Sequence, residues 1–302
     1  MNPVEIKGII PALITPMNED ESLNLKELRN QVNRMIESGC HGIFCLGTNG
    51  EGYILDAAEK IQVLEAVVDE CNGRVPVYAG TGVHSTKETI RLSRTAMDIG
   101  ADVLSLVTPG FAAASQSELF THYETIAKAV DMPIVLYNIP ARTGNALDPA
   151  TVGRLAELEN IVGIKDSSGN FVNLLSYLDV GRRRKQGGFA VLSGNDQLII
   201  WTLMAGGAGG IAGCANVYPR TLASVYDLFI DGKIEEAKAM NAAVQTLRGC
   251  FKYGNPNTIV KTAVAMLGYP VGKCRAPFNQ VPADGIEALK KALAESKEKG
   301  MA

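Results

Sequence analysis

Eight short apolar runs recur along the chain, and glycine, proline or asparagine bounds each of them. The runs cover residues 8–16, 42–47, 76–82, 102–109, 133–140, 161–168, 189–195 and 209–213. Nearly continuous apolar runs of this length are typical of strands that are buried on both faces of a parallel sheet. The pattern therefore predicts eight buried strands.

Amphipathic stretches separate these runs and predict helices. In residues 23–39, apolar residues recur at spacings of three and four, which forms one apolar face on a helix. Residues 56–73 and 85–100 follow the same pattern, and a glycine ends each stretch. The last stretch opens with Ser85 and, three positions on, Glu88, which together predict a capping box.

The alternation of strands and helices indicates the fold class. Eight successive strand–helix units imply right-handed βαβ connections, and eight such units close more naturally into a barrel than into an open sheet. We therefore expect an α/β protein with a (β/α)8 TIM barrel over residues 1–232. Strand signals stop after residue 232, so residues 233–302 are expected to form a C-terminal helical extension packed on the barrel.

Composition and charge narrow the classes of partner. The chain has 302 residues, of which 46% are hydrophobic and 20% charged, as in soluble globular proteins. A net charge of −3 argues against a broad basic surface, and hence against nucleic acid as a partner. Because no apolar run approaches the ~20 residues of a membrane span and no signal peptide is evident, we expect a cytoplasmic protein with no membrane partner.

Cysteine and histidine spacing speaks against disulfides and metal sites. The six cysteines lack C-x-x-C spacing and are expected to be reduced thiols. His41, His84 and His122 lie far apart and show no ligand spacing, so no metal site is predicted.

In a TIM barrel the reacting groups lie at the carboxyl ends of the strands, and one such end carries a lysine. Lys165 follows an apolar run and points to the same side as Ile161 and Gly163, where Gly163 leaves room under its stem. It could instead reach out to solvent and pair with Asp166. Burial disfavours the charged form of an amine because the ammonium group loses its hydration, and a neutral amine can attack a carbonyl to form a Schiff base.

Three further polar positions lie at or after strand ends, and each has a structural and a functional interpretation. Tyr137 is either an ordinary core aromatic or a group that carries protons. The turn GTNGEG (47–52) is either an ordinary glycine-rich turn or a carboxylate site formed by backbone N–H groups and the Thr48 hydroxyl. Arg142 is either a surface arginine or a guanidinium placed for a substrate carboxylate.

Four stretches taken together resemble the dihydrodipicolinate synthase/N-acetylneuraminate lyase family. They are GTNGEG, YNIPARTG, GIKDSSG and GGAGGIAGCANV, and the resemblance extends in order from GIIPALITP to GYPVGKCRAPF. The resemblance implies a (β/α)8 barrel with a C-terminal helical extension, usually a homotetramer. It further implies a class I aldolase or synthase that forms a covalent Schiff base with pyruvate or another 2-oxo acid and needs no metal or organic cofactor.

The resemblance also implies catalytic roles for three residues. Lys165 would be the Schiff-base lysine, and Tyr137 would shuttle protons. Thr48 would assist Tyr137 in moving them.

The resemblance also implies a second set of residues that bind substrate, and Thr48 belongs to both sets. Thr48 and Asn49, beside Gly47, would bind the pyruvyl carboxylate. Arg142 would grip the carboxylate of the second substrate, and Ile211 would supply a backbone carbonyl near the bound pyruvate.

Three departures from the synthase pattern bear on the substrate. Gly110 and Phe111 stand where synthases typically carry two tyrosines, the second of which relays protons to a neighbouring subunit's site. KDSSG replaces a KEATG-like stretch and is more similar to sugar-acid and 4-hydroxy-2-oxoglutarate aldolases. Asn49 replaces a threonine, and its hydrogen-bonding geometry differs.

These departures favour a lyase that forms or cleaves a 2-keto-3-deoxy sugar acid or a 4-hydroxy-2-oxo acid from pyruvate and an aldehyde. The alternatives are a true 4-hydroxy-tetrahydrodipicolinate synthase, which uses pyruvate and aspartate semialdehyde, and a non-catalytic barrel that binds a 2-oxo acid. A hydrolase or isomerase on the same fold also stays open, since a fold does not determine the chemistry.

Overall fold

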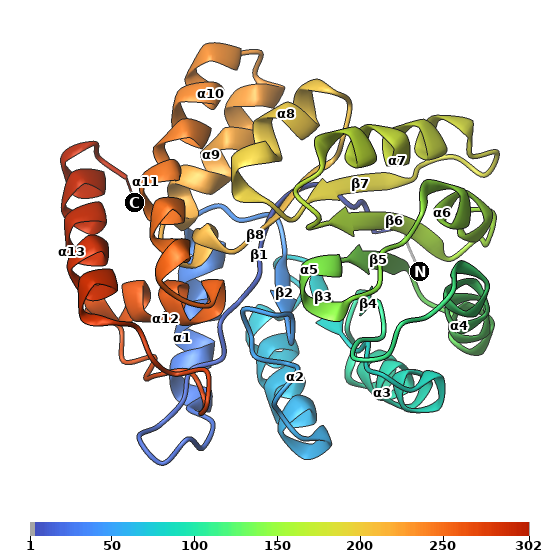
Figure 1. Ribbon diagram of the computed structural model, residues 1–302, viewed down its shortest axis with the longest axis horizontal. Coiled ribbons are helices and arrows are strands. Elements are labelled where there is room, and N and C mark those ends of the chain that lie inside the picture. Colours follow the sequence, from blue (N-terminus) through green and yellow to red (C-terminus); the bar gives the residue numbers. More distant parts are fainter. Residues whose placement is uncertain (1–3, 302) are drawn as a thin grey trace. The chain divides into compact units, whose positions relative to one another are not determined.

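The computed structural model describes residues 4–301, in which strands alternate with helices (Figure 1). The strands are β1 (Gly8–Pro11), β2 (Ile43–Cys45), β3 (Val77–Gly80), β4 (Val103–Val107), β5 (Ile134–Asn138), β6 (Ile161–Asp166), β7 (Ala190–Ser193) and β8 (Gly209–Ala212). Each lies within one of the eight predicted runs. They form one sheet in the order β1-β8-β7-β6-β5-β4-β3-β2, which confirms the expected (β/α)8 TIM barrel.

The strands are shorter than the apolar runs that predict them, and local backbone geometry explains one of the ends. Strand β2 ends at Cys45 because Leu46 has a φ of 61°, in the left-handed region that a strand cannot use. Beyond β1, pairing continues for one residue only: Ala12 forms a parallel bridge with Phe44, and its N–H donates to the Ala212 carbonyl at 3.0 Å.

Eight helices lie between the strands. They are α1 (Leu25–Glu37), α2 (Ala57–Cys71), α3 (Thr86–Ile99), α4 (Gln116–Ala129), α5 (Pro140–Thr143), α6 (Pro149–Leu155), α7 (Phe171–Arg183) and α8 (Ile199–Met204). Of these, α1, α2 and α3 fall within the three predicted stretches. At α3, the Ser85 side chain accepts a hydrogen bond from the Glu88 N–H, while the Glu88 carboxylate binds Arg91. Only the serine half of the predicted capping box is therefore confirmed.

The part of the chain after β8 is helical, as the loss of strand signals predicts. Its helices are α9 (Pro219–Ile230), α10 (Ile234–Ala243), α11 (Gln245–Arg248), α12 (Pro256–Met266) and α13 (Ala283–Glu298). Short 3-10 turns occur at η1 (Asp196–Leu198), η2 (Cys214–Asn216) and η3 (Gly249–Tyr253). The predicted boundary between barrel and extension at residue 232 stays a prediction.

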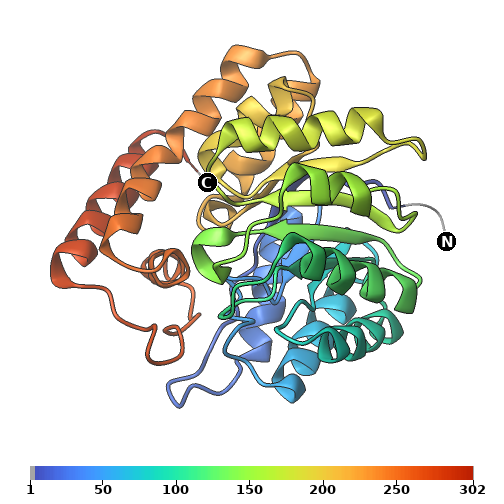
Figure 2. The same cartoon turned by 45° about the vertical axis from the view of Figure 1, so that its right-hand side comes forward.

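The chain divides into two compact units. The first unit consists mainly of Tyr78–Ile211 and contains the paired strands β4 to β7. Helices α4, α6 and α7 lie along the outer side of these strands (Figure 2). This unit brings together the strand ends that carry Tyr137 and Lys165.

The second unit consists of Gly8–Val77 and the chain from Ala212 onward. It contains β1 and β2, the turn that follows β2, and helices α9 to α13. Asn216 is fully buried in this unit, where its side chain accepts from the Ile14 N–H at 3.0 Å and donates to the Ala12 carbonyl at 2.7 Å. This amide therefore anchors the segment that follows β1 to the turn that follows β8.

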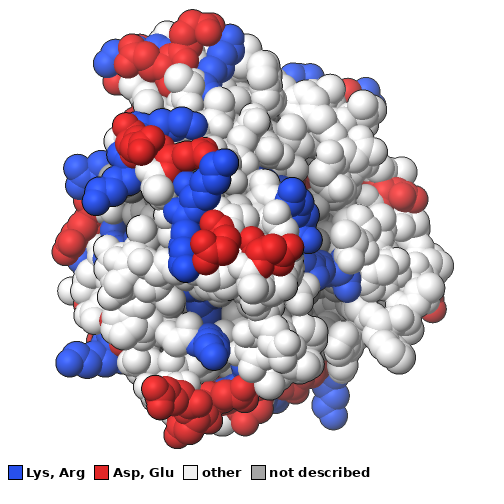
Figure 3. Space-filling view, turned by 60° about the vertical axis from the view of Figure 1, so that its left-hand side comes forward, with Lys and Arg blue, Asp and Glu red and all other residues white. Residues whose placement is uncertain are grey.

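Charged side chains of both signs are interspersed on the face that Figure 3 shows, and much of that face is uncharged. All six cysteines are buried free thiols, as their spacing predicts. Within residues 4–301, no helix is long and apolar enough to cross a membrane.

Candidate active site

Lys165 lies at the carboxyl end of β6, and its side chain is only 3% exposed. Its predicted burial is therefore confirmed. Tyr137, at the end of β5, is equally buried at 3%, and the Lys165 Nζ lies 3.8 Å from the centroid of its ring. The lysine thus combines poor solvation with one close aromatic neighbour.

A change of register between β5 and β6 brings these two residues together. Ile134 is paired with Ile161, but Val135 is paired with Gly163, so one residue of β6 is passed over. Without this irregularity Tyr137 would lie opposite Ile164, whereas the structure places it opposite Lys165. The register shift is therefore what sets Tyr137 opposite Lys165.

Space for the lysine stem comes from Gly194 in the loop after β7. A Cβ atom at Gly194 would lie 3.0 Å from the Lys165 Cε and 1.9 Å from the Ser167 Oγ. At Gly163, the glycine expected to make this room, the nearest atoms belong to Ala190 on β7, with its carbonyl oxygen at 2.5 Å. Gly163 thus permits the close approach of β7, and Gly194 is the glycine that contacts the lysine.

The residues that follow Tyr137 and Lys165 form a second buried pair. The Asn138 Nδ2 donates to the Asp166 Oδ1 at 2.8 Å, and the Ser168 hydroxyl donates to the Asp166 Oδ2 at 2.8 Å. Burial raises the pKa of the Asp166 carboxyl, although these hydrogen bonds act to lower it. The pair joins the ends of β5 and β6 directly behind the lysine and tyrosine.

The loop after β5 carries Arg142, which lies on α5 and is exposed. Nearby, the Asn145 side chain is buried; its amide donates to the carbonyls of Pro109 and Ala112 at 2.9 and 2.8 Å. These bonds fasten the loop after β4, on which Phe111 is fully exposed with a φ of 75°. Asn145 thus links the loop after β5, which carries Arg142, to the loop after β4.

In the second unit, the turn after β2 holds Gly47, Thr48 and Asn49. Thr48 and Asn49 are half-buried, and the Thr48 carbonyl accepts from the Glu51 N–H at 3.2 Å. The Asn49 Nδ2 occupies the space that a side chain at Gly213 would need, 2.8 Å from the ideal Cβ position. Asn49 therefore lies against the residue that follows β8.

Ile211 lies on β8 and is 1% exposed. Five of the other predicted site residues fall into two groups. The first group is Lys165 with Tyr137, and the second is Gly47 with Thr48 and Asn49. That both groups serve one substrate is part of the proposal below. Among residues 4–301, no group of three or more His, Cys, Asp or Glu side chains could hold a metal ion.

Sequence reasoning missed several residues that support the site. Asn138 and Asp166 each directly follow a predicted site residue on paired strands, so their adjacency was a usable signal. Gly194 and Asn145 act through contacts with segments about 30 residues away, for which the sequence holds no local pattern.

TIM-barrel enzymes carry their chemistry at the carboxyl ends of the strands, and a buried lysine and tyrosine lie together at two such ends here. The chain belongs to the dihydrodipicolinate synthetase family, whose model matches residues 5–296. Members of this family are class I, pyruvate-dependent lyases and synthases.

Individual relatives agree with this assignment over nearly their whole length. The chain is 41% identical over 295 residues to a 4-hydroxy-tetrahydrodipicolinate synthase of Methanopyrus kandleri, covering 96% of each chain. A dihydrodipicolinate synthase from Acinetobacter baumannii, solved in complex with pyruvate, has a TM-score of 0.92 at 35% identity and covers 97% of this chain and 99% of its own. A structure described as a monomeric dihydrodipicolinate synthase variant has a TM-score of 0.93 at 29% identity, with 97% of both chains covered.

Proposed function

We propose that this protein condenses pyruvate with aspartate semialdehyde, as a 4-hydroxy-tetrahydrodipicolinate synthase. The observation that carries the proposal is the buried Lys165 against Tyr137, in a chain with several curated relatives that bear the synthase name. Those names favour the condensation over the sugar-acid or 4-hydroxy-2-oxo acid aldolase that the sequence departures indicate.

In the first step, the neutral Lys165 amine attacks C2 of pyruvate, and Tyr137 moves the protons that allow water to leave. The resulting protonated imine withdraws electrons from C3, which loses a proton and becomes an enamine carbon. Family members use pyruvate through such a Schiff base without a metal or external cofactor, which supports the same route here.

In the second step, the enamine C3 attacks the aldehyde carbon and forms the new C–C bond. Thr48 and Asn49, with Gly47, would hold the pyruvyl carboxylate so that C2 faces the amine. Arg142 would bind the carboxylate of the second substrate, and the Ile211 carbonyl would lie near the bound pyruvate. Because Phe111 carries no hydroxyl, the proton route beyond Tyr137 would use water or Thr48 alone.

Turnover assays with two kinds of substrate test the proposal. The purified protein is given pyruvate with aspartate semialdehyde, and separately a panel of 2-keto-3-deoxy sugar acids and 4-hydroxy-2-oxo acids. We expect pyruvate consumption to depend on aspartate semialdehyde, and Lys165→Ala to abolish it. Pyruvate release from the panel without condensation would overturn the synthase proposal in favour of the aldolase.

A covalent pyruvate adduct without turnover of either kind would indicate the non-catalytic binding barrel. The homotetramer stays a prediction, and light scattering on the purified protein checks it. A monomer or dimer would contradict it, and the monomeric variant among the structural relatives shows that the fold does not require a tetramer.

A further inference from the structure

The turn that carries Thr48 and Asn49 ends in a fully buried glutamate, Glu51. Its Oε1 lies 2.7 Å from the Nζ of Lys261 on α12, which is 1% exposed. Its Oε2 accepts a hydrogen bond from the Arg275 backbone N–H at 2.8 Å. Both carboxylate oxygens therefore bind groups from the C-terminal helical part of the second unit.

Stability alone gives no reason for a buried ion pair at this place. Removing two charges from water is costly, and replacement of such pairs by apolar residues is often neutral or stabilising. Neither Glu51 nor Lys261 has a part in the proposed chemistry. The pair joins residues 210 positions apart, so it links the turn to the C-terminal helices.

The backbone of the turn shows what such a link could hold in place. Glu51 has a φ of 56° and Leu46 a φ of 61°, and both values are unfavourable for residues other than glycine. Strained residues of this kind persist only where surrounding contacts hold them. Between them lie Thr48 and Asn49, the proposed carboxylate-binding residues.

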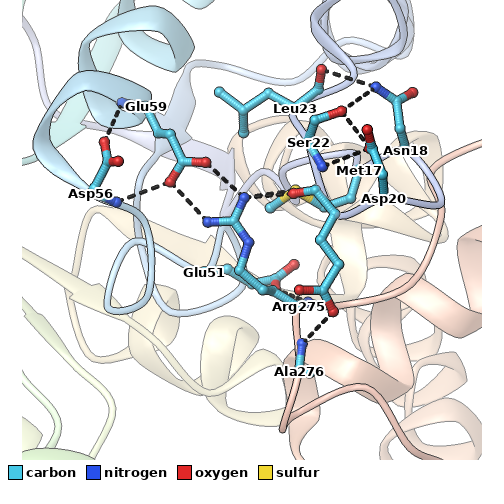
Figure 4. Close-up of polar contacts among 11 residues, drawn as sticks. Met17, Asn18, Asp20, Ser22, Leu23, Glu51, Asp56, Glu59, Arg275 and Ala276 are labelled. Carbon is cyan, nitrogen blue, oxygen red and sulfur yellow. Dashed lines mark hydrogen bonds and ion pairs between the residues drawn. The ribbon is translucent and has the colours of Figure 1, made fainter.

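The segment that donates to Glu51 is itself firmly fixed. The Arg275 guanidinium donates to both carboxylate oxygens of Glu59, at 2.7 and 2.8 Å, and to the Glu21 carbonyl at 2.6 Å (Figure 4). The Ala276 N–H donates to the Glu21 carboxylate at 2.9 Å. Glu51 is thus held by a network that extends to the start of α2 and to the loop before α1.

We infer that the Glu51–Lys261 ion pair positions the Thr48–Asn49 turn for the pyruvate carboxylate. Glu51 and Lys261 are then positioning residues, which act on substrate through the turn. The inference rests on the proposed function, because it takes the carboxylate site at Thr48 and Asn49 from it. Loss of the pair moves the carboxylate site and leaves the Lys165 amine in place, so pyruvate binding weakens more than the chemical step slows.

The test measures borohydride-trapped adduct formation against pyruvate concentration, which yields a half-saturation concentration and a limiting rate without any aldehyde. Three variants are compared with the wild type: Glu51→Gln, Lys261→Met and the double variant. Val260→Ala, at a fully buried neighbouring position of α12, is the matched control for loss of stability.

We expect Lys261→Met to lower the Tm strongly, because it leaves the buried Glu51 carboxylate without its cation, and to raise the half-saturation concentration about 10-fold or more. The double variant, without buried charges, recovers most of the Tm while the half-saturation concentration stays raised. Val260→Ala lowers the Tm and leaves pyruvate binding unchanged.

The inference is overturned if the double variant recovers both the Tm and the wild-type half-saturation concentration. It is also overturned if Val260→Ala weakens pyruvate binding as much as Glu51→Gln does. If single variants fail to fold, the double variant decides alone by the same criterion. A wild-type protein that traps no pyruvate overturns the proposed function and this inference together, whereas a reactive wild type with unaffected variants overturns only the inference.

Discussion

Substitution of Gly194 by alanine is expected to perturb the Lys165 side chain, although Gly194 itself has no reactive group. The added methyl group would lie 3.0 Å from the Lys165 Cε and from the Ser167 Cβ, and 1.9 Å from the Ser167 Oγ. The hydroxyl can rotate away from the methyl group. The two carbon contacts remain, each a few tenths of an ångström short of ordinary van der Waals contact, so the lysine stem has to shift.

The expected magnitude follows from these contacts. Overpacking of a buried site costs about 1–3 kcal/mol in the free energy of unfolding. Misplacement by 1 Å can cost about 100-fold in rate, so a shift of a few tenths of an ångström is expected to slow adduct formation about 10-fold. The assay is the initial rate of borohydride-trapped pyruvate adduct, followed by intact mass, beside a urea unfolding curve.

Two companion variants separate stability from reactivity. Gly194→Ala/Ser167→Ala removes the hydroxyl, so part of the lost stability should return while the contact with Lys165 still slows the reaction relative to Ser167→Ala. Gly153→Ala on α6 meets nothing closer than 3.8 Å and is expected to stabilise the protein without a change in rate. An unaltered rate and stability in Gly194→Ala would refute the placement of the lysine stem beside this glycine.

Three further substitutions test the surroundings of the lysine. Tyr137→Phe keeps the ring against Lys165 but removes the hydroxyl, so adduct formation should slow about 100-fold or more; a wild-type rate would show that another group moves the proton. Burial raises the pKa of Asp166 above its ordinary 3.8, so its carboxyl binds a proton more tightly folded than unfolded, and stability is lost as the pH rises through the folded pKa. As the pH rises from 3.8 toward neutrality, the free energy of unfolding of Asp166→Asn should therefore fall less than that of the wild type. Urea unfolding measures this, and an identical pH dependence in the two proteins would contradict it. Phe111→Tyr restores a hydroxyl at the exposed tip of its loop and should raise the rate of aspartate semialdehyde condensation; an unchanged rate would show that protons do not pass through this position.

The fold could be predicted because buried strands and amphipathic helices leave strong patterns in the sequence. All eight strands fall within apolar runs that glycine, proline or asparagine bounds. Their exact ends could not be predicted, since β2 is ended by the left-handed conformation of Leu46, a residue type that ordinarily continues a strand.

The candidate site was predictable only as far as strand ends could be located. Tyr137 and Lys165 end successive runs, so their proximity follows from a parallel sheet, but the register shift that sets them opposite each other has no sequence signal. The expectation that Gly163 makes room for the lysine failed for a similar reason, because the glycine beside the stem, Gly194, comes from another strand's loop.

Supporting contacts between distant segments could not be predicted from the sequence. Glu51 and Lys261 are each ordinary charged residues in their local stretches, and only the folded chain shows that both are buried and paired. Long-range pairs of this kind depend on tertiary packing, which local periodicity does not encode.

The central claim is that the amine of Lys165 reacts with pyruvate, and peptide mapping of the borohydride-reduced adduct tests it most directly. Lys165 and Lys261 are the two buried lysines within residues 4–301, so the map distinguishes the reactive amine from a lysine that is merely buried. We predict a single adduct, on the peptide that contains Lys165. An adduct on Lys261 or on exposed lysines, or no adduct at all, would contradict the account.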